Sequence, residues 1–270
     1  MSSTRPTGNS AAESKIGNAR LRAPYFWLPN ALTTGALWAG FYAIVAAIDH
    51  NFSRAGIAIF VAMVFDGLDG RVARWTNTQS EFGKEYDSLS DMVSFGVAPA
   101  IVTYQFGVAN LAEANAAWGR LGWLATFLYA ACAAMRLARF NSRVATADKR
   151  FFEGLPSPSA AATVAGFIWL ASEYELTGLV TRVVAFAITI VIGLLMMSSF
   201  AYWSGKELNV RGRVRWAYLL IIPVAYTVIS AGPGEALFGM FVVYAAHAPV
   251  IWAWRKVFHR RHRDNVAAKL

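Results

Sequence analysis

The chain has 270 residues, of which 56% are hydrophobic and only 15% carry a charge. A soluble domain would carry about 25% charged residues, so the composition excludes a soluble globular enzyme and predicts an all-α, polytopic integral membrane helix bundle. The single cysteine, Cys132, excludes an intramolecular disulfide and a metal site built from cysteines.

A transmembrane helix needs about 20 predominantly apolar residues to cross the hydrocarbon core of a bilayer. By this measure the sequence predicts about eight spans, over residues 27–48, 55–74, 85–105, 119–140, 156–172, 182–202, 214–231 and 235–254. We therefore expect one transmembrane domain over 24–255. It lies between a polar, disordered cytoplasmic tail over 1–23 and a basic cytoplasmic tail over 256–270.

The placement of the basic residues predicts the orientation of the chain. If the N-terminus lies in the cytoplasm, 22 of the 25 lysines and arginines fall on the cytoplasmic side, and only Arg54, Arg120 and Arg182 fall on the other. The positive-inside rule then predicts a topology with both termini in the cytoplasm. The net charge of +9 is explained by this distribution and by contacts with anionic membrane lipids, so we expect no nucleic-acid partner.

Four aspartates lie at helical spacing in the second and third predicted spans. Asp66 and Asp69 are three residues apart, and Asp87 and Asp91 are four apart, so each pair shares one face of its helix. A short polar turn over 75–84 joins the two antiparallel spans on the cytoplasmic side, so we expect the pairs to face each other. Carboxylates beside hydrocarbon are costly unless paired or metal-bound. Four hard oxygen ligands favour two divalent cations, Mg²⁺ or Mn²⁺.

Small residues are interleaved with these acids. Gly70 lies four residues after Asp66, and Gly83 begins the next helix. A glycine inside a helix costs about 1 kcal/mol relative to alanine, and close approach of a ligand to the backbone would explain it. Arg74 follows Gly70 by one turn, and its guanidinium fork suits phosphate oxygens. The alternative interpretation of the acids is charge pairing with nearby basic side chains: Arg71, Arg74 and Lys84.

These residues form the complete pattern D-x2-D-G-x2-A-R-x8-G-x3-D-x3-D over 66–91. The chain therefore resembles the CDP-alcohol phosphatidyltransferases, membrane enzymes that transfer a phosphatidyl group from CDP-diacylglycerol to an alcohol. The specificity of the pattern favours a metal site over charge pairing. The flanking segments FDGLDGRVAR, DSLSDMVSFGVAPA, MRLARFN and GLPSPSAAA are similar to the bacterial phosphatidylserine synthase branch. This narrower resemblance covers about 27–165, which we expect to be the catalytic half.

The resemblance implies transfer of a phosphatidyl group to L-serine, giving phosphatidylserine and CMP. It implies that two divalent ions bridging the donor diphosphate are held by four carboxylates: Asp66, Asp69, Asp87 and Asp91. Asp91 would also be the general base for the serine hydroxyl. Substrate-binding roles are implied for six further residues: Asn30 and Thr33 in the nucleotide pocket, Gly70, Ala73 and Gly83 around the cytidine and diphosphate, and Arg74 on the phosphates.

Arg136 and Arg139 end the fourth predicted span and allow two interpretations. Both could be cytoplasmic anchors under the positive-inside rule. Alternatively, one of them faces the site and binds a phosphate or the carboxylate of serine.

Two other functions remain open. The acceptor could be another alcohol, such as glycerol 3-phosphate or an inositol phosphate, because residues outside the shared motif set the acceptor pocket. A divalent-cation transporter is the alternative from another class, but its acids should lie near the membrane midplane and recur in both halves. The family resemblance further implies a homodimer in the bacterial inner membrane, with the active site at the cytoplasmic face.

Overall fold

The computed structural model describes residues 27–108, 116–143, 151–203, 227 and 230–267. Its helices are α2 (Trp27–Ile48), α3 (Phe52–Trp75), α4 (Glu81–Asp91), α5 (Ala98–Thr103), α6 (Ala116–Arg143), α7 (Ser157–Glu173), α8 (Leu179–Met197) and α10 (Pro233–Ala267). Two π-helical turns flank α5, namely η2 (Met92–Val97) and η3 (Tyr104–Val108). Two short strands are β1 (Phe151–Glu153) and β2 (Ala201–Trp203).

Four of the described helices are long and apolar enough to cross a membrane: α2, residues 117–143 of α6, α8, and residues 233–256 of α10. The prediction of a helical integral membrane protein is thereby confirmed. The count of eight spans and the orientation of the termini stay predictions. The seventh predicted span, 214–231, lies almost wholly outside the described residues, as do the tail over 1–23 and residues 268–270. Residues 256–267 of the second tail continue helix α10.

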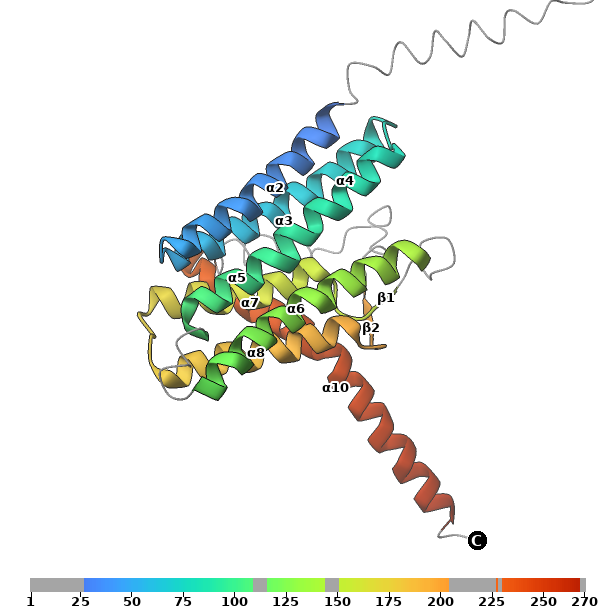
Figure 1. Ribbon diagram of the computed structural model, residues 1–270. Coiled ribbons are helices and arrows are strands. Elements are labelled where there is room, and N and C mark those ends of the chain that lie inside the picture. The colour runs from blue at the N-terminus through green and yellow to red at the C-terminus, as the bar shows by residue number, and fades with distance from the viewer. Residues whose placement is uncertain (1–26, 109–115, 144–150, 204–226, 228–229, 268–270) are drawn as a thin grey trace, which may run out of the picture.

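Helices α2 and α3 form an antiparallel pair with a closely packed interface (Figure 1). The turn between them is capped by Asn51, whose side chain accepts a hydrogen bond from the Arg54 amide. The buried face of α2 consists largely of alanine, with Gly40 among them, and α3 buries Ala55, Gly56, Ala58 and Ala62 against it. Small residues let helix backbones approach each other in a membrane, where the hydrophobic effect does not drive helices together.

The third predicted span is one helical path that runs from α4 through η2 and α5 to η3. Its π-helical turn has a visible cause in Pro99, which has no N–H and cannot donate to the Phe95 carbonyl four residues earlier. The hydroxyl of Tyr129, a fully buried residue of α6, donates to that carbonyl instead, at 3.1 Å. The turn is therefore held open by a neighbouring helix.

The prediction of an all-α chain is wrong in one detail, because β1 and β2 pair in antiparallel fashion, with Phe152 opposite Tyr202. The sixth predicted span, 182–202, accordingly ends as a helix at Met197. After this helix end, Tyr202 of β2 is fixed against α10. Its ring is fully buried, and its hydroxyl donates to the Ala245 carbonyl of α10 at 2.9 Å.

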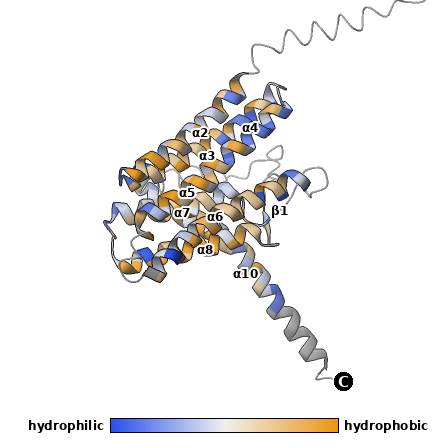
Figure 2. Ribbon diagram, viewed as in Figure 1, coloured by the Kyte–Doolittle hydropathy of each residue, from blue (hydrophilic) through white to orange (hydrophobic). Residues whose placement is uncertain are grey.

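The remaining helices form a second group, in which α6 packs on α8, and α7 packs on both α3 and α10 (Figure 1). The C-terminal part of α10 projects away from this body. Figure 2 shows apolar residues over most of the packed helices and a concentration of hydrophilic residues on α4. The polar residues of the first half are therefore gathered beside α2 and α3, where the predicted site lies.

Candidate active site

Three of the four predicted aspartates converge between α3 and α4. Each of Asp66, Asp69 and Asp87 offers a carboxylate oxygen, and these atoms lie within 4.8 Å of one another. Asp69 is only 5% exposed, whereas the other two are partly exposed. The loop over 76–80 reverses the chain, with Asn77 in the left-handed region (φ 52°) and Ser80 capping α4. This reversal brings the i, i+3 pair of α3 against the i, i+4 pair of α4.

Asp91 borders the same cluster, because its carboxyl group is close enough to those of Asp66 and Asp87 for their charges to interact. Two carboxyl groups in such contact repel each other unless a proton or a cation lies between them. Among the described residues, the ion pairs within 4.0 Å join Glu153 to Arg139 and Arg143, and none involves these four aspartates. The geometry thus gives no support to charge pairing with neighbouring basic side chains. A cluster of hard oxygen donors fits Mg²⁺ or Mn²⁺.

Thr33 orients one member of this cluster. Its hydroxyl donates to Oδ2 of Asp69 at 2.6 Å, from the buried face of α2. The Thr33 carbonyl in turn accepts from the Ser90 hydroxyl of α4 at 3.2 Å. Hydrogen bonds of this kind fix the direction of a metal-binding carboxylate. The sequence predicted a nucleotide contact for Thr33, and the structure places it on a carboxylate of the cluster.

The glycines of the motif differ in what surrounds them. A Cβ added at Gly70 would meet nothing nearer than Nη1 of Arg74, at 3.8 Å, so the backbone there is open on that side. A Cβ at Gly83 would lie 3.4 Å from Oδ1 of Asn30 and 3.1 Å from Oγ of Ser80. Gly83 therefore lets the start of α4 approach the start of α2. Open space beside Gly70, with an arginine folded over it, can accept an anionic group next to the carboxylates.

Arg136 approaches Asp91 from α6. It is 7% exposed, and its Nη1 donates to Oγ of the fully buried Ser157 at 2.7 Å. Its guanidinium also lies over the Phe140 ring, 5.5 Å from the centroid, and is close enough to Asp91 for their charges to interact. An anchor for lipid headgroups needs an exposed cation, whereas the Arg136 guanidinium is buried beside the acids. Ser157 was not predicted as a site residue, although it lies in the GLPSPSAAA segment that carries part of the family resemblance.

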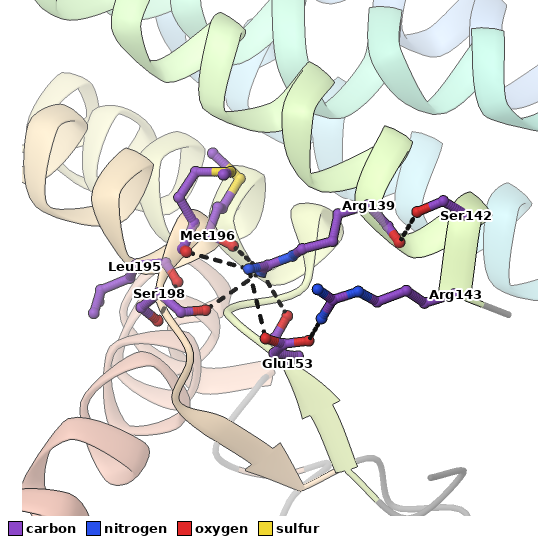
Figure 3. Close-up of polar contacts among 8 residues, drawn as sticks. Arg139, Ser142, Arg143, Glu153, Leu195, Met196 and Ser198 are labelled. Atoms are coloured by element: carbon purple, nitrogen blue, oxygen red, sulfur yellow. Dashed lines mark hydrogen bonds and ion pairs between the residues drawn. The ribbon is translucent and has the colours of Figure 1, made fainter. Parts of the chain in front are cut away.

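Arg139 is engaged differently (Figure 3). Its guanidinium donates to four main-chain carbonyls at 3.0–3.3 Å, those of Glu153, Met196, Met197 and Ser198. It also lies 3.9 Å from the Glu153 carboxylate, which pairs with Arg143 as well. Of the two arginines at the end of the fourth predicted span, the structure therefore brings Arg136 to the aspartates and directs Arg139 toward the end of α8.

Comparison with known proteins shows which proteins the chain is similar to. Residues 26–197 match the CDP-alcohol phosphatidyltransferase family. A Helicobacter pylori protein named CDP-diacylglycerol–serine O-phosphatidyltransferase is 34% identical over 236 residues, which cover 87% of this chain and 94% of the relative. A Mycobacterium bovis protein of the same name is 32% identical over 82% of this chain and 77% of the relative. An archaetidylserine synthase of Methanothermobacter thermautotrophicus is 39% identical over 65% of this chain and 69% of the relative.

The matched region contains every residue of the aspartate motif and the whole cluster described above. The chain belongs to the CDP-alcohol phosphatidyltransferase family.

Proposed function

We propose that this protein transfers the phosphatidyl group of CDP-diacylglycerol to the hydroxyl of L-serine, releasing CMP. The observation that carries this proposal is the convergence of the motif carboxylates between α3 and α4, in a chain whose relatives with the names above cover most of its length. The serine oxygen forms a bond to the phosphorus of the phosphatidyl group, the bond from that phosphorus to the CMP oxygen breaks, and the serine proton leaves with a base of the protein.

Each residue of the cluster has a part in this reaction. We assign the donor diphosphate to a metal site formed by Asp66, Asp69, Asp87 and Asp91, in which divalent cations neutralise the phosphate charge when bound. Thr33 holds the Asp69 carboxylate in place through its hydroxyl. We assign the serine proton to Asp91, because its carboxyl group interacts both with the other acids and with the buried Arg136.

We also assign the substrate pockets to residues of the motif and its neighbours. Asn30, Gly70, Ala73, Arg74 and Gly83 surround the cytidine and the diphosphate, with Arg74 next to the open backbone at Gly70. Arg136 binds the carboxylate of serine, because a buried guanidinium beside the base can fix the acceptor by charge and by direction.

An acceptor panel tests this function. Purified protein in detergent, supplied with CDP-diacylglycerol and Mg²⁺ or Mn²⁺, is expected to release CMP with L-serine at least about 100-fold faster than with glycerol 3-phosphate or an inositol phosphate. Mass spectrometry of the lipid product checks that phosphatidylserine forms. Asp66→Asn protein is the matched control for contaminating activity. Faster release with either phosphorylated alcohol would reassign the acceptor while keeping the chemistry.

A transporter is the less supported alternative. Among the described residues, Asp66, Asp69 and Asp87 form the single cluster of potential metal ligands, and all three lie in the first half of the chain. No matching group lies in the described part of the second half, as a transporter built from repeats would require.

We further propose that the chain is a homodimer in the bacterial inner membrane, with eight spans, both termini in the cytoplasm and the site open to that side. The distribution of basic residues supports the orientation. The polar tails over 1–23 and 256–270 would then flank a transmembrane domain over 24–255.

Cysteine labelling tests the topology. In a Cys132→Ser background, an impermeant maleimide is expected to label Asp49→Cys in intact spheroplasts, because the turn after α2 faces the periplasm. Ala268→Cys should be labelled only after permeabilisation. Labelling of the C-terminal cysteine in intact spheroplasts, with the Asp49 position protected, would reverse the orientation.

A further inference from the structure

The end of α6 is joined to the end of α8 by one side chain, that of Arg139. Its planar guanidinium reaches four carbonyl oxygens from two chain segments, Glu153 on one side and residues 196–198 on the other. Figure 3 shows the guanidinium between the two segments. Carbonyls in the last turn of a helix have no partner within the helix, and Arg139 donates to two of these, Met196 and Met197, and to the C-cap residue Ser198. Its side chain is only 19% exposed, compared with 56% for Arg143.

Gly154 completes this contact. It lies in the left-handed region (φ 79°), and a Cβ there would be 2.3 Å from the Met196 carbonyl oxygen and 2.8 Å from Nη2 of Arg139. Only glycine leaves room for such an approach. Its amide donates to the Phe200 carbonyl at 2.9 Å, and the next amide, of Leu155, donates to the Leu195 carbonyl at 3.0 Å. Residues 153–155 are thus fixed on both sides.

This fixed segment leads directly into the site. Two residues after Leu155, the chain reaches Ser157, the first residue of α7, whose hydroxyl accepts the hydrogen bond of Arg136. Arg136 lies one turn before Arg139 on α6 and interacts with Asp91. A displacement of residues 153–155 would carry Ser157 with it and change the direction of the Arg136 guanidinium.

We propose that Arg139 is a positioning residue for the acceptor side of the active site. Together with Gly154, it clamps residues 153–155 against the end of α8, and so holds Ser157 where it orients Arg136 beside Asp91. Three of the four donor-side carboxylates, Asp66, Asp69 and Asp87, lie on α3 and α4 and have no hydrogen bond to the residues of this clamp. This inference rests on the proposed transferase function and deepens it.

The test compares substitutions that break the clamp in two ways. Arg139→Lys keeps the charge but cannot direct five N–H donors at several carbonyls, and Gly154→Ala places a methyl group on the Met196 carbonyl without changing any charge. Each variant is expected to lower kcat/KM for serine about 10- to 100-fold, as for small displacements in an active site, with the KM for CDP-diacylglycerol unchanged. The double variant should be no worse than the poorer single variant, because both act on one contact.

Arg143→Lys is the matched control at the same helix end and should behave as the unaltered protein. If Arg139 is an anchor only, Arg139→Lys will be silent; if it contacts serine directly, Gly154→Ala will be silent. Either result overturns the proposal, as does an equal loss on the donor side. If both clamp variants misfold, Ser157→Ala provides the test. Unchanged kinetics with serine in Ser157→Ala would refute the proposal that Ser157 connects the clamp to Arg136. The unaltered protein is assayed in parallel with the acceptor panel, so a wrong choice of acceptor is recognised separately. The single and double variants are then compared with the acceptor that the unaltered protein uses.

Discussion

Asp87→Asn protein is expected to lose phosphatidyl transfer by at least about 10³-fold while remaining folded. The substitution conserves volume but removes one negative oxygen ligand from the cluster that Asp87 forms with Asp66 and Asp69. Cations that neutralise the transferred phosphate supply several kcal/mol to the transition state, and about 4 kcal/mol corresponds to 10³-fold in rate. Asp66→Asn and Asp69→Asn should have the same effect. CMP release at saturating Mg²⁺ or Mn²⁺ measures it.

A second measurement separates metal binding from activity. Adding Mg²⁺ or Mn²⁺ should raise the melting temperature of the unaltered protein, because a ligand that binds only the folded state stabilises it. This shift should be absent or reduced in Asp87→Asn. Chelation should inactivate the unaltered protein reversibly. Asp49→Asn, on the exposed turn after α2, is the control and should keep both the shift and the activity. Near-normal turnover of an Asp87→Asn preparation would remove this residue from the metal site.

Asp91→Asn is expected to lower turnover about 10²- to 10⁴-fold, the usual range for a general base, and yet to keep its affinity for CDP-diacylglycerol. Three carboxylates of the cluster remain in this variant, so donor binding with metal should persist. The comparison is with Asp87→Asn, which should lose donor binding as well. The measurements are donor affinity and single-turnover CMP release, made on both variants in the same detergent.

The outcome distinguishes the two roles proposed for Asp91. Its carboxyl group lies close to those of Asp66 and Asp87 and close to Arg136, so it borders both the metal cluster and the acceptor side. If donor affinity falls equally in Asp91→Asn and Asp87→Asn, then Asp91 acts chiefly as a metal ligand, and the base must be another group.

The aspartate cluster could be predicted from sequence because the residues that determine it lie within one short segment, 66–91. Two pairs at helical spacing, joined by a short polar turn, leave an antiparallel arrangement as the simple solution, and the structure has it. The partner of Asp69 was harder to assign. Thr33 was predicted at the nucleotide, but its hydroxyl donates to Asp69 across a helix interface, and nothing in the sequence pattern sets that contact between residues 36 positions apart.

The contacts of Arg139 could not be predicted for a different reason. Its acceptors are main-chain carbonyls, which every residue possesses, so no side-chain pattern marks them. The β1–β2 pairing is likewise too short to show alternation, since three residues do not define a period of two. The π-helical turn has a local cause in Pro99, but the donor that satisfies the Phe95 carbonyl comes from Tyr129, a residue of another helix.

That turn also determines the rotational phase of the helix that carries Asp87 and Asp91. Successive residues of an α-helix are separated by about 100° around its axis, and a π-helical turn holds one residue more than an α-helical one. The wide turn η2 therefore resets the angular relation between α4, whose acids must point at α3, and α5, whose apolar side chains must point into the bundle. Helix α4 can keep its acids toward the site while α5 keeps Ala98, Pro99 and Val102 buried. In a single uniform α-helix, the direction of the α4 acids would also fix the direction of the α5 apolar side chains, so the two could not be set separately.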